Sequence, residues 1–182
     1  METLPKDMIE YMTNQLSPPD LILFCASEVR PNVKQICDDN DFWIRRWNKD
    51  FEYLKYEIPN YLQNPKQSYL ALFSKISEGA EELSDLFLKL NTNLLTIDNK
   101  KQLYNYFFQH ISKILPSIFS ELEGMKPKNL AEWYIEFATD IDEMDNFKNS
   151  FPTLTNINNK IILNVISLPL SKIILKIYKS YY

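Results

Sequence analysis

The apolar residues at the start of the chain recur at helical spacings and are interrupted by prolines and capping residues. A first short helix follows Pro5, because the fixed φ angle of proline suits a helix start. Its predicted apolar face consists of Met8, Ile9, Met12 and Leu16. Ser17 and Asp20 resemble a capping box, so a second helix begins between them and ends before Pro31. A very short third helix precedes the polar run 38–41, which we interpret as a solvated helix cap.

Three aromatic residues spaced four apart predict a further helix, and a proline- and asparagine-rich connection follows it. The aromatic residues are Trp43, Trp47 and Phe51. The connection covers residues 54–65. We therefore divide the chain into segments 1–54 and 55–182.

The longest periodic pattern lies in residues 69–90, where apolar positions alternate spacings of four and three. Its members are Tyr69, Phe73, Ile76, Ala80, Leu83, Phe87 and Leu90. Such a seam can pair with a second copy of the chain. The extra leucines at 70, 72, 86 and 88 broaden the stripe, which favours the face of an intramolecular bundle over self-association.

The remaining residues predict three more helices. One runs from Asp98 to Gly124 with a kink at Pro116, and the next begins near Asn129 and includes Ile141 and Met144. A polar loop at 146–159 leads to the apolar segment 161–182. Polar and basic interruptions make that segment too short for a membrane span, so we expect a central bundle helix with lysines along one edge.

Composition and charge agree with an all-α fold and narrow the function. Only two glycines occur among 182 residues, whereas a β-rich fold needs many for its turns. The formal net charge of −4 gives no basic footprint for nucleic acid. The N-terminal residues lack the features of a signal peptide, and Cys25 and Cys37 are expected to be small core thiols in a reducing, cytoplasmic compartment.

We find no catalytic, cofactor or metal signature and expect no enzyme activity. The single histidine, His110, lies beside an apolar helix face and is interpreted as a structural imidazole. The acidic residues Asp140, Asp142, Glu143 and Asp145 are expected on the solvated polar face of a helix, and they lack the glycine and terminal glutamate of a calcium loop. A metal-dependent hydrolase using these three aspartates is a weak alternative. Two isolated glycines cannot build a phosphate-binding loop.

The order of short motifs in the first segment resembles the F-box family. They are Leu4-Pro5 through Ile9, Leu16 through Leu21, Cys25 through Arg30, Ile36-Cys37, and Asp41-Phe42-Trp43. The resemblance implies a three-helix module that docks on a Skp1-type adaptor and joins a cullin-RING ubiquitin ligase. It assigns the adaptor-facing or module-core positions to Leu4, Pro5, Ile9, Leu16, Leu21, Val29 and Trp43. Pro31 departs from the family pattern near the end of the second helix.

Two functions follow as hypotheses. The first is an F-box-like receptor whose segment 55–182 recruits a substrate protein. The second is a helical scaffold, such as a virion component, that self-associates through residues 69–90. The residue bias and the short F-box-like organisation resemble proteins of large DNA viruses, which would place the chain in the host cytoplasm or in the virion.

Overall fold

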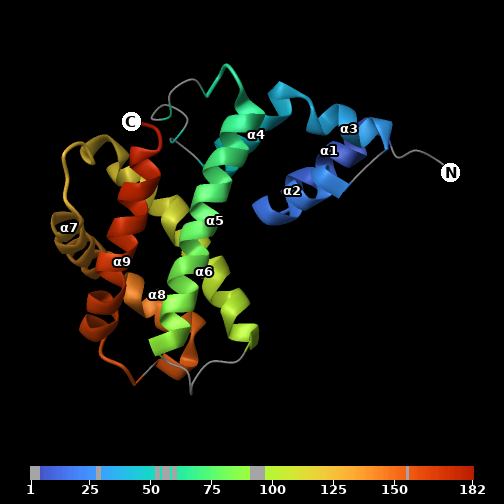
Figure 1. The fold of residues 1–182 in the computed structure, drawn as a ribbon. Coiled ribbons are helices and arrows are strands. Elements are labelled where there is room, and N and C mark those ends of the chain that lie inside the picture. The colour runs from blue at the N-terminus through green and yellow to red at the C-terminus, as the bar shows by residue number, and fades with distance from the viewer. Residues whose placement is uncertain are drawn as a thin grey trace. The chain divides into compact units, whose positions relative to one another are not determined.

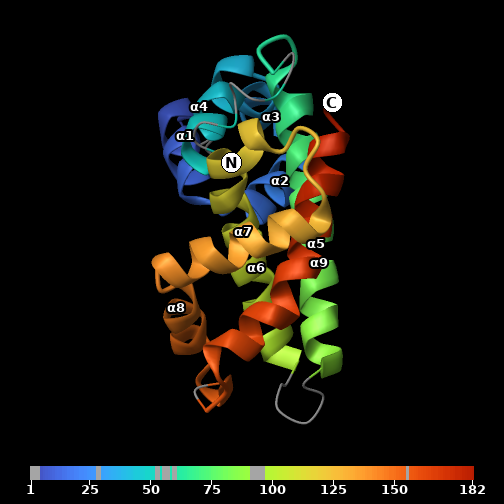
Figure 2. The ribbon, with the colours of Figure 1, turned by 90° about the vertical axis from the view of Figure 1, so that its left-hand side faces the viewer.

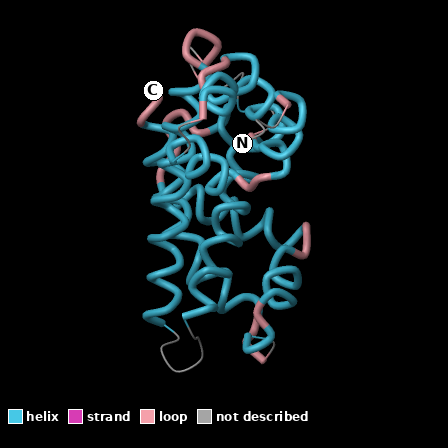
Figure 3. The backbone as a smooth tube through the Cα atoms, turned by 90° about the vertical axis from the view of Figure 1, so that its right-hand side faces the viewer, coloured by secondary structure: helices cyan, strands magenta, loops and turns pink. Residues whose placement is uncertain are grey.

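A computed structural model describes residues 5–27, 30–51, 54, 58, 61–90, 97–154 and 156–182 (Figure 1). Within these ranges the chain consists of helices, turns and loops, and no strand is present (Figure 3). The prediction of an all-α fold is confirmed. The chain divides into two compact units, Met1–Ser74 and Lys75–Tyr182.

The first unit contains four short helices and the beginning of a long one. The short helices are α1 (Lys6–Gln15), α2 (Pro18–Ser27), α3 (Pro31–Cys37) and α4 (Asn40–Asp50). The long helix is α5 (Pro65–Leu90), of which residues 65–74 belong to this unit. The described part of segment 1–54 thus has one helix more than the three that the family resemblance implies. The unit also extends past residue 54, because the start of α5 packs on α4.

Local capping explains where two of these helices begin. The Ser17 hydroxyl donates to the Asp20 carboxylate at 2.5 Å and accepts from the Asp20 backbone N–H at 3.4 Å, which confirms the predicted capping box. Asp39 in the polar run 38–41 accepts from the Asp41 backbone N–H at 3.0 Å and caps α4, as predicted.

The core of the first unit is aromatic. Trp43, Trp47 and Phe51 are each at most 1% exposed, as their spacing predicted. The phenol ring of Tyr69, on α5, lies 5.0 Å from the Trp43 ring and 5.1 Å from the Phe51 ring. Both indole N–H groups are satisfied, and that of Trp47 donates to the carbonyl of Pro65 at 3.0 Å. The beginning of α5 is therefore part of this core.

The second unit consists of residues 75–90 of α5 and the helices that follow. They are α6 (Ile97–Ile118), η2 (Phe119–Glu121), α7 (Pro127–Asp140), α8 (Glu143–Ser150), η3 (Pro152–Leu154) and α9 (Asn159–Lys179). Helices α7 and α9 pack side by side (Figure 2). The helix α6 is shorter than predicted, because it ends at Ile118 and not at Gly124. Pro116 lies in its last turn, and a 3-10 turn follows Ile118.

The break between α7 and α8 was not predicted from the sequence. Helix α7 ends at Asp140, and Asp142, with a φ angle of 50° in the left-handed region, is the N-cap of α8. Ile141, predicted to point inward on a continuous helix, is 39% exposed. The predicted loop at 146–159 begins instead as helix up to Ser150.

The prediction that this segment is too short for a membrane span is wrong: among the described residues, α9 is long and apolar enough to cross a membrane by length and composition. More than half of its apolar window, 56%, is buried inside the chain, as in the core helix of a soluble protein. Ser167 and Ser171 are buried in it as well, and the Ser171 hydroxyl donates to the Ser167 carbonyl at 2.6 Å. This burial agrees with its predicted place as a central bundle helix.

Candidate protein-docking surface

One side of α1 presents three large apolar side chains to solvent. Met8 and Met12 are each 50% exposed and Tyr11 is 68% exposed. Their spacing of three and four places them on one helical face, which we call the α1 face. Leu23 on α2 is a further exposed apolar side chain of this unit, at 67%.

The orientation of α1 differs from the sequence prediction. The buried side of this helix carries Ile9 and Thr13, whereas the predicted inward residues Met8 and Met12 face solvent. Thr13 can be buried because its hydroxyl contacts the carbonyls of Ile9 and Glu10 at 3.0 and 2.9 Å. Thr13 therefore lies in the core, and Met8 and Met12 are exposed to solvent.

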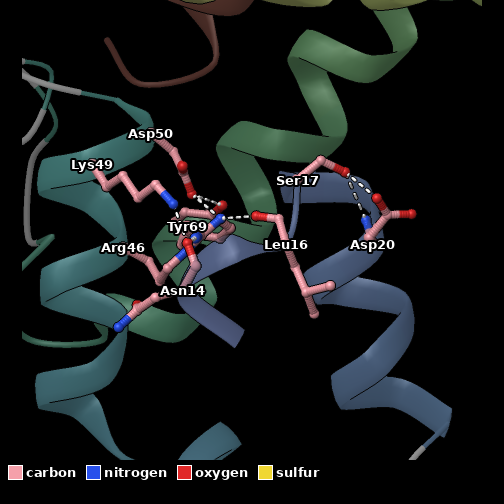
Figure 4. Close-up of polar contacts among 8 residues, drawn as sticks. All are labelled: Asn14, Leu16, Ser17, Asp20, Arg46, Lys49, Asp50 and Tyr69. Atoms are coloured by element: carbon pink, nitrogen blue, oxygen red, sulfur yellow. Dashed lines mark hydrogen bonds and ion pairs between the residues drawn. The ribbon is translucent and has the colours of Figure 1, made fainter. Parts of the chain in front are cut away.

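A buried arginine fixes the end of α1 (Figure 4). The guanidinium of Arg46, on α4, donates to the carbonyls of Asn14 at 3.3 Å and Leu16 at 3.1 Å. These carbonyls lie at the C-terminal end of α1, which has no further helical turn to bond them. Lys49 also donates to the Asn14 carbonyl. The cations therefore hold the helix that carries the α1 face.

Asp50 neutralises this arginine inside the unit. Its carboxylate lies 2.6 Å from the Arg46 guanidinium and accepts from the Tyr69 hydroxyl at 2.6 Å. Burial raises the pKa of Asp50, while the Tyr69 hydrogen bond and the Arg46 charge oppose that rise. Burial and the adjacent carboxylate also raise the pKa of Tyr69. Sequence reasoning missed this network, although the spacing of Arg46 and Asp50 permits an i,i+4 ion pair.

The expectation of two free thiols is wrong. Cys25 on α2 and Cys37 on α3 form a disulfide, with their Cα atoms 5.7 Å apart. Because the two helices pack against each other, residues twelve apart in sequence meet in space. The bond links the helices of the first unit and removes the argument for a reducing compartment that rested on free cysteines.

The structure distributes the site residues implied by the family resemblance between core and surface. Ile9, Leu21 and Trp43 are buried, Leu16 is half-buried, and Pro5 is exposed. Leu4 and Val29 lie outside the described residues. The buried three form the module core, so the exposed α1 face carries most of the apolar surface that a partner could reach on α1.

The seam at 69–90 is used within the chain. Five of its members are buried: Tyr69, Ile76, Ala80, Leu83 and Phe87. Gly79, between them, packs so closely on Ile173 of α9 that a Cβ atom would overlap its side chain. These five side chains are therefore not available to a second chain.

The second unit contains a buried polar network around His110 and Glu143. One ring nitrogen of His110 lies 2.8 Å from the Tyr134 hydroxyl, and the other lies 3.1 Å from the Glu143 carboxylate. Tyr106 donates to the same carboxylate at 2.8 Å, and Lys113 contacts it at 3.4 Å. Because His110, Glu143 and Tyr134 are at most 5% exposed, the network joins α6, α7 and α8 through buried side chains.

Glu143 is a charged residue that sequence reasoning placed on a solvated helix face. Burial raises the pKa of its carboxyl, but His110, Tyr106 and Lys113 lower it more, to about 2. The neighbouring Asp140, Asp142 and Asp145 are exposed, and no group of three metal-binding side chains occurs among the described residues. The hydrolase alternative gains no support from their arrangement.

The geometry thus defines an all-α protein with an exposed apolar face held by a buried ion pair. Comparison of the chain with family models, with curated proteins and with solved structures found no match.

Proposed function

We propose that the chain is a protein-binding receptor that docks on a Skp1-type adaptor through its first unit, as an F-box protein does. The observation that carries the proposal is the α1 face, whose Met8, Tyr11 and Met12 are at least half exposed while the core beneath them is closed. Large apolar side chains gathered on one face of a helix are typical of a helix that packs on a partner.

The adaptor is proposed because the motif order through Trp43 resembles the F-box. Three positions of the resemblance, Ile9, Leu21 and Trp43, are buried and contribute to the core that a small module needs. On this proposal the second unit recruits the substrate protein, and the function is binding without catalysis.

The test is binding of the purified chain to a purified Skp1-type adaptor by calorimetry. Met12→Asp places a charge at the centre of the α1 face, so we expect affinity to fall by at least about thirtyfold, as for a binding hot spot. The matched control is Leu62→Asp, which alters another apolar side chain of the same unit, 68% exposed and just before α5 in the sequence.

Far-UV circular dichroism of both variants checks that the fold is kept. Equal adaptor affinity of wild type and Met12→Asp would refute the proposal, as would absence of binding by the wild type. The scaffold hypothesis is addressed by sedimentation velocity. Five residues of the 69–90 seam are buried within the chain, which argues against the seam as the assembly surface, and a monomer at all concentrations would remove that alternative.

A further inference from the structure

The lysines along the edge of α9 line a pocket of about 400 Å³ in the second unit. We call it the lysine pocket, and its lining residues are Pro127, Lys172, Leu175, Lys176, Lys179 and Ser180. Leu175 is buried and forms an apolar part of its wall, whereas the three lysines are exposed. The volume lies in the range of small-molecule sites.

The charges of the lysine pocket are uncompensated. None of its described lining residues is acidic, and no ion pair joins Lys172, Lys176 or Lys179 to a carboxylate in the described part of the chain. Two other lysines of the second unit do have a carboxylate partner: Lys100 lies 2.7 Å from Asp85 and Lys113 lies 3.4 Å from Glu143. Three lysines that line one depression without such a partner form a local surplus of positive charge on a chain whose net charge is −4.

The fold alone does not account for this surplus. Lys176 and Lys179 lie in the last turn of α9, where a cation is favourable beside the negative end of the helix. Lys172 lies before that turn and gains little from it. Its spacing of four from Lys176 brings two like charges together, which destabilises a helix. A bound anion would attract both lysines and offset their mutual repulsion.

The other wall of the pocket is also suited to an anion. Pro127 is the first residue of α7, and the preceding Lys126 provides no side-chain cap for the backbone N–H groups of that helix start. The beginning of α7 thus lies beside the end of α9, and its positive end adds to the field of the lysines. Lysine ammonium groups bind phosphate as point charges, without requiring a planar fork.

We propose that the lysine pocket binds a small, multiply charged phosphate compound. Three cations around one depression match an anion with several negative charges better than a single carboxylate. Two sources share this chemistry: a soluble polyphosphate and the phosphorylated headgroup of a lipid. The pocket is independent of the α1 face, so its test leaves adaptor docking untouched.

The experiment measures binding of inorganic tripolyphosphate to the full chain by calorimetry and, separately, sedimentation of the chain with phosphatidylcholine vesicles that contain or lack phosphatidylinositol bisphosphate. Lys172→Gln should weaken binding about fivefold, the effect of one surface cation near an anion. The triple change of Lys172, Lys176 and Lys179 to Gln should abolish it. Added salt should weaken wild-type binding.

Lys160→Gln is the matched control, because it removes one exposed lysine from the same helix outside the pocket. It should leave affinity within about twofold of wild type, since a distant exposed charge is screened. Tripolyphosphate binding alone identifies a soluble ligand, and binding only to the phosphoinositide vesicles identifies a headgroup. Equal effects of Lys172→Gln and Lys160→Gln, or no binding of either probe by wild type, would overturn the proposal. If the triple variant fails to fold, the single variants decide the question.

Discussion

The two units bury charge in different ways. In the first unit a permanent cation, Arg46, pairs with Asp50 and bonds backbone carbonyls at the end of α1. In the second, the Glu143 carboxylate, whose pKa is lowered, accepts from Tyr106 and contacts His110. The comparison shows that one ion pair terminates a helix, whereas the other joins side chains of three helices. The first should therefore matter most for structure and the second for response to pH.

The largest expected effect is that of Arg46→Met. The change leaves Asp50 buried without its cation, removes the Arg46 hydrogen bond to the Leu16 carbonyl and leaves the Asn14 carbonyl with Lys49, so the first unit should lose about 3 to 5 kcal/mol of unfolding free energy. Urea unfolding is followed by the fluorescence of Trp43 and Trp47, in a Trp133→Phe background that silences the only tryptophan of the second unit.

The control for this variant is Arg45→Met. Arg45 is 51% exposed in its side chain and lies 3.8 Å from Glu10, so its loss should cost less than about 1 kcal/mol. Similar losses for both arginines would show that the buried pair does not fix the end of α1.

The second prediction concerns acid. The folded-state pKa of Glu143, about 2, lies below its ordinary value of 4.5, so its contribution is complete above about pH 4.5 and is lost as the pH falls toward 2. The shift corresponds to about 3 kcal/mol. Amide hydrogen exchange in α7 and α8 should therefore accelerate in this window, and Glu143→Gln should flatten the dependence.

Asp50 should behave oppositely, because its folded-state pKa is raised. A carboxyl of this kind contributes stability at low pH that is lost as the pH rises through its folded-state pKa.

The control for Glu143 is Glu136→Gln, at an exposed position of α7, which should leave the acid response of the second unit unchanged. If Glu143→Gln kept the wild-type dependence of hydrogen exchange on pH, and both units lost stability together in acid, the acid response would not belong to Glu143.

The third prediction concerns the disulfide. Cys25→Ser, or reduction, should destabilise the first unit by about 2 to 3 kcal/mol, because the bond restricts a loop of twelve residues in the unfolded chain. Thiol titration of the unfolded, unreduced chain should find no free thiol. Two reactive thiols, or an unchanged urea midpoint on reduction, would show that the bond does not form.

The smallest expected effect is a gain. Asp142→Gly should stabilise the second unit by up to about 1 kcal/mol, because glycine adopts a positive φ angle without the steric cost that aspartate has. Thermal unfolding of the full chain measures it. The control is Asp140→Gly, at a helical φ angle in α7, which should destabilise by about the same amount. If both variants were more stable than wild type, or both less stable, the backbone conformation at residue 142 would not be the cause.

Local signals in the sequence were sufficient for most helices. The Ser17 and Asp20 pair, the cap at Asp39 and the tryptophans of α4 could be predicted, because capping and helical periodicity act between near neighbours. The break at Asp142 could not, since aspartate only occasionally adopts the left-handed conformation and no glycine or proline marks the position.

The candidate site depends on contacts between residues far apart in sequence, and it was predicted less well. Methionine is more hydrophobic than threonine, yet on α1 Thr13 is buried and Met8 and Met12 are exposed. Thr13 can be buried because its hydroxyl donates to a carbonyl of its own helix. The pairing of Cys25 with Cys37 required the packing of α2 on α3. Glu143 was assigned to solvent because its partners Tyr106 and His110 lie on another helix.

The contribution of α5 to the first unit bears on how the protein is cut for study. A fragment ending at residue 54 would lack Tyr69, whose ring packs on Trp43 and whose hydroxyl bonds Asp50. Its interior would open to water at the place where the aromatic rings meet. Truncation experiments aimed at the amino-terminal module should keep the chain through at least residue 74, or the fragment will report the damage of the cut instead of the properties of the module.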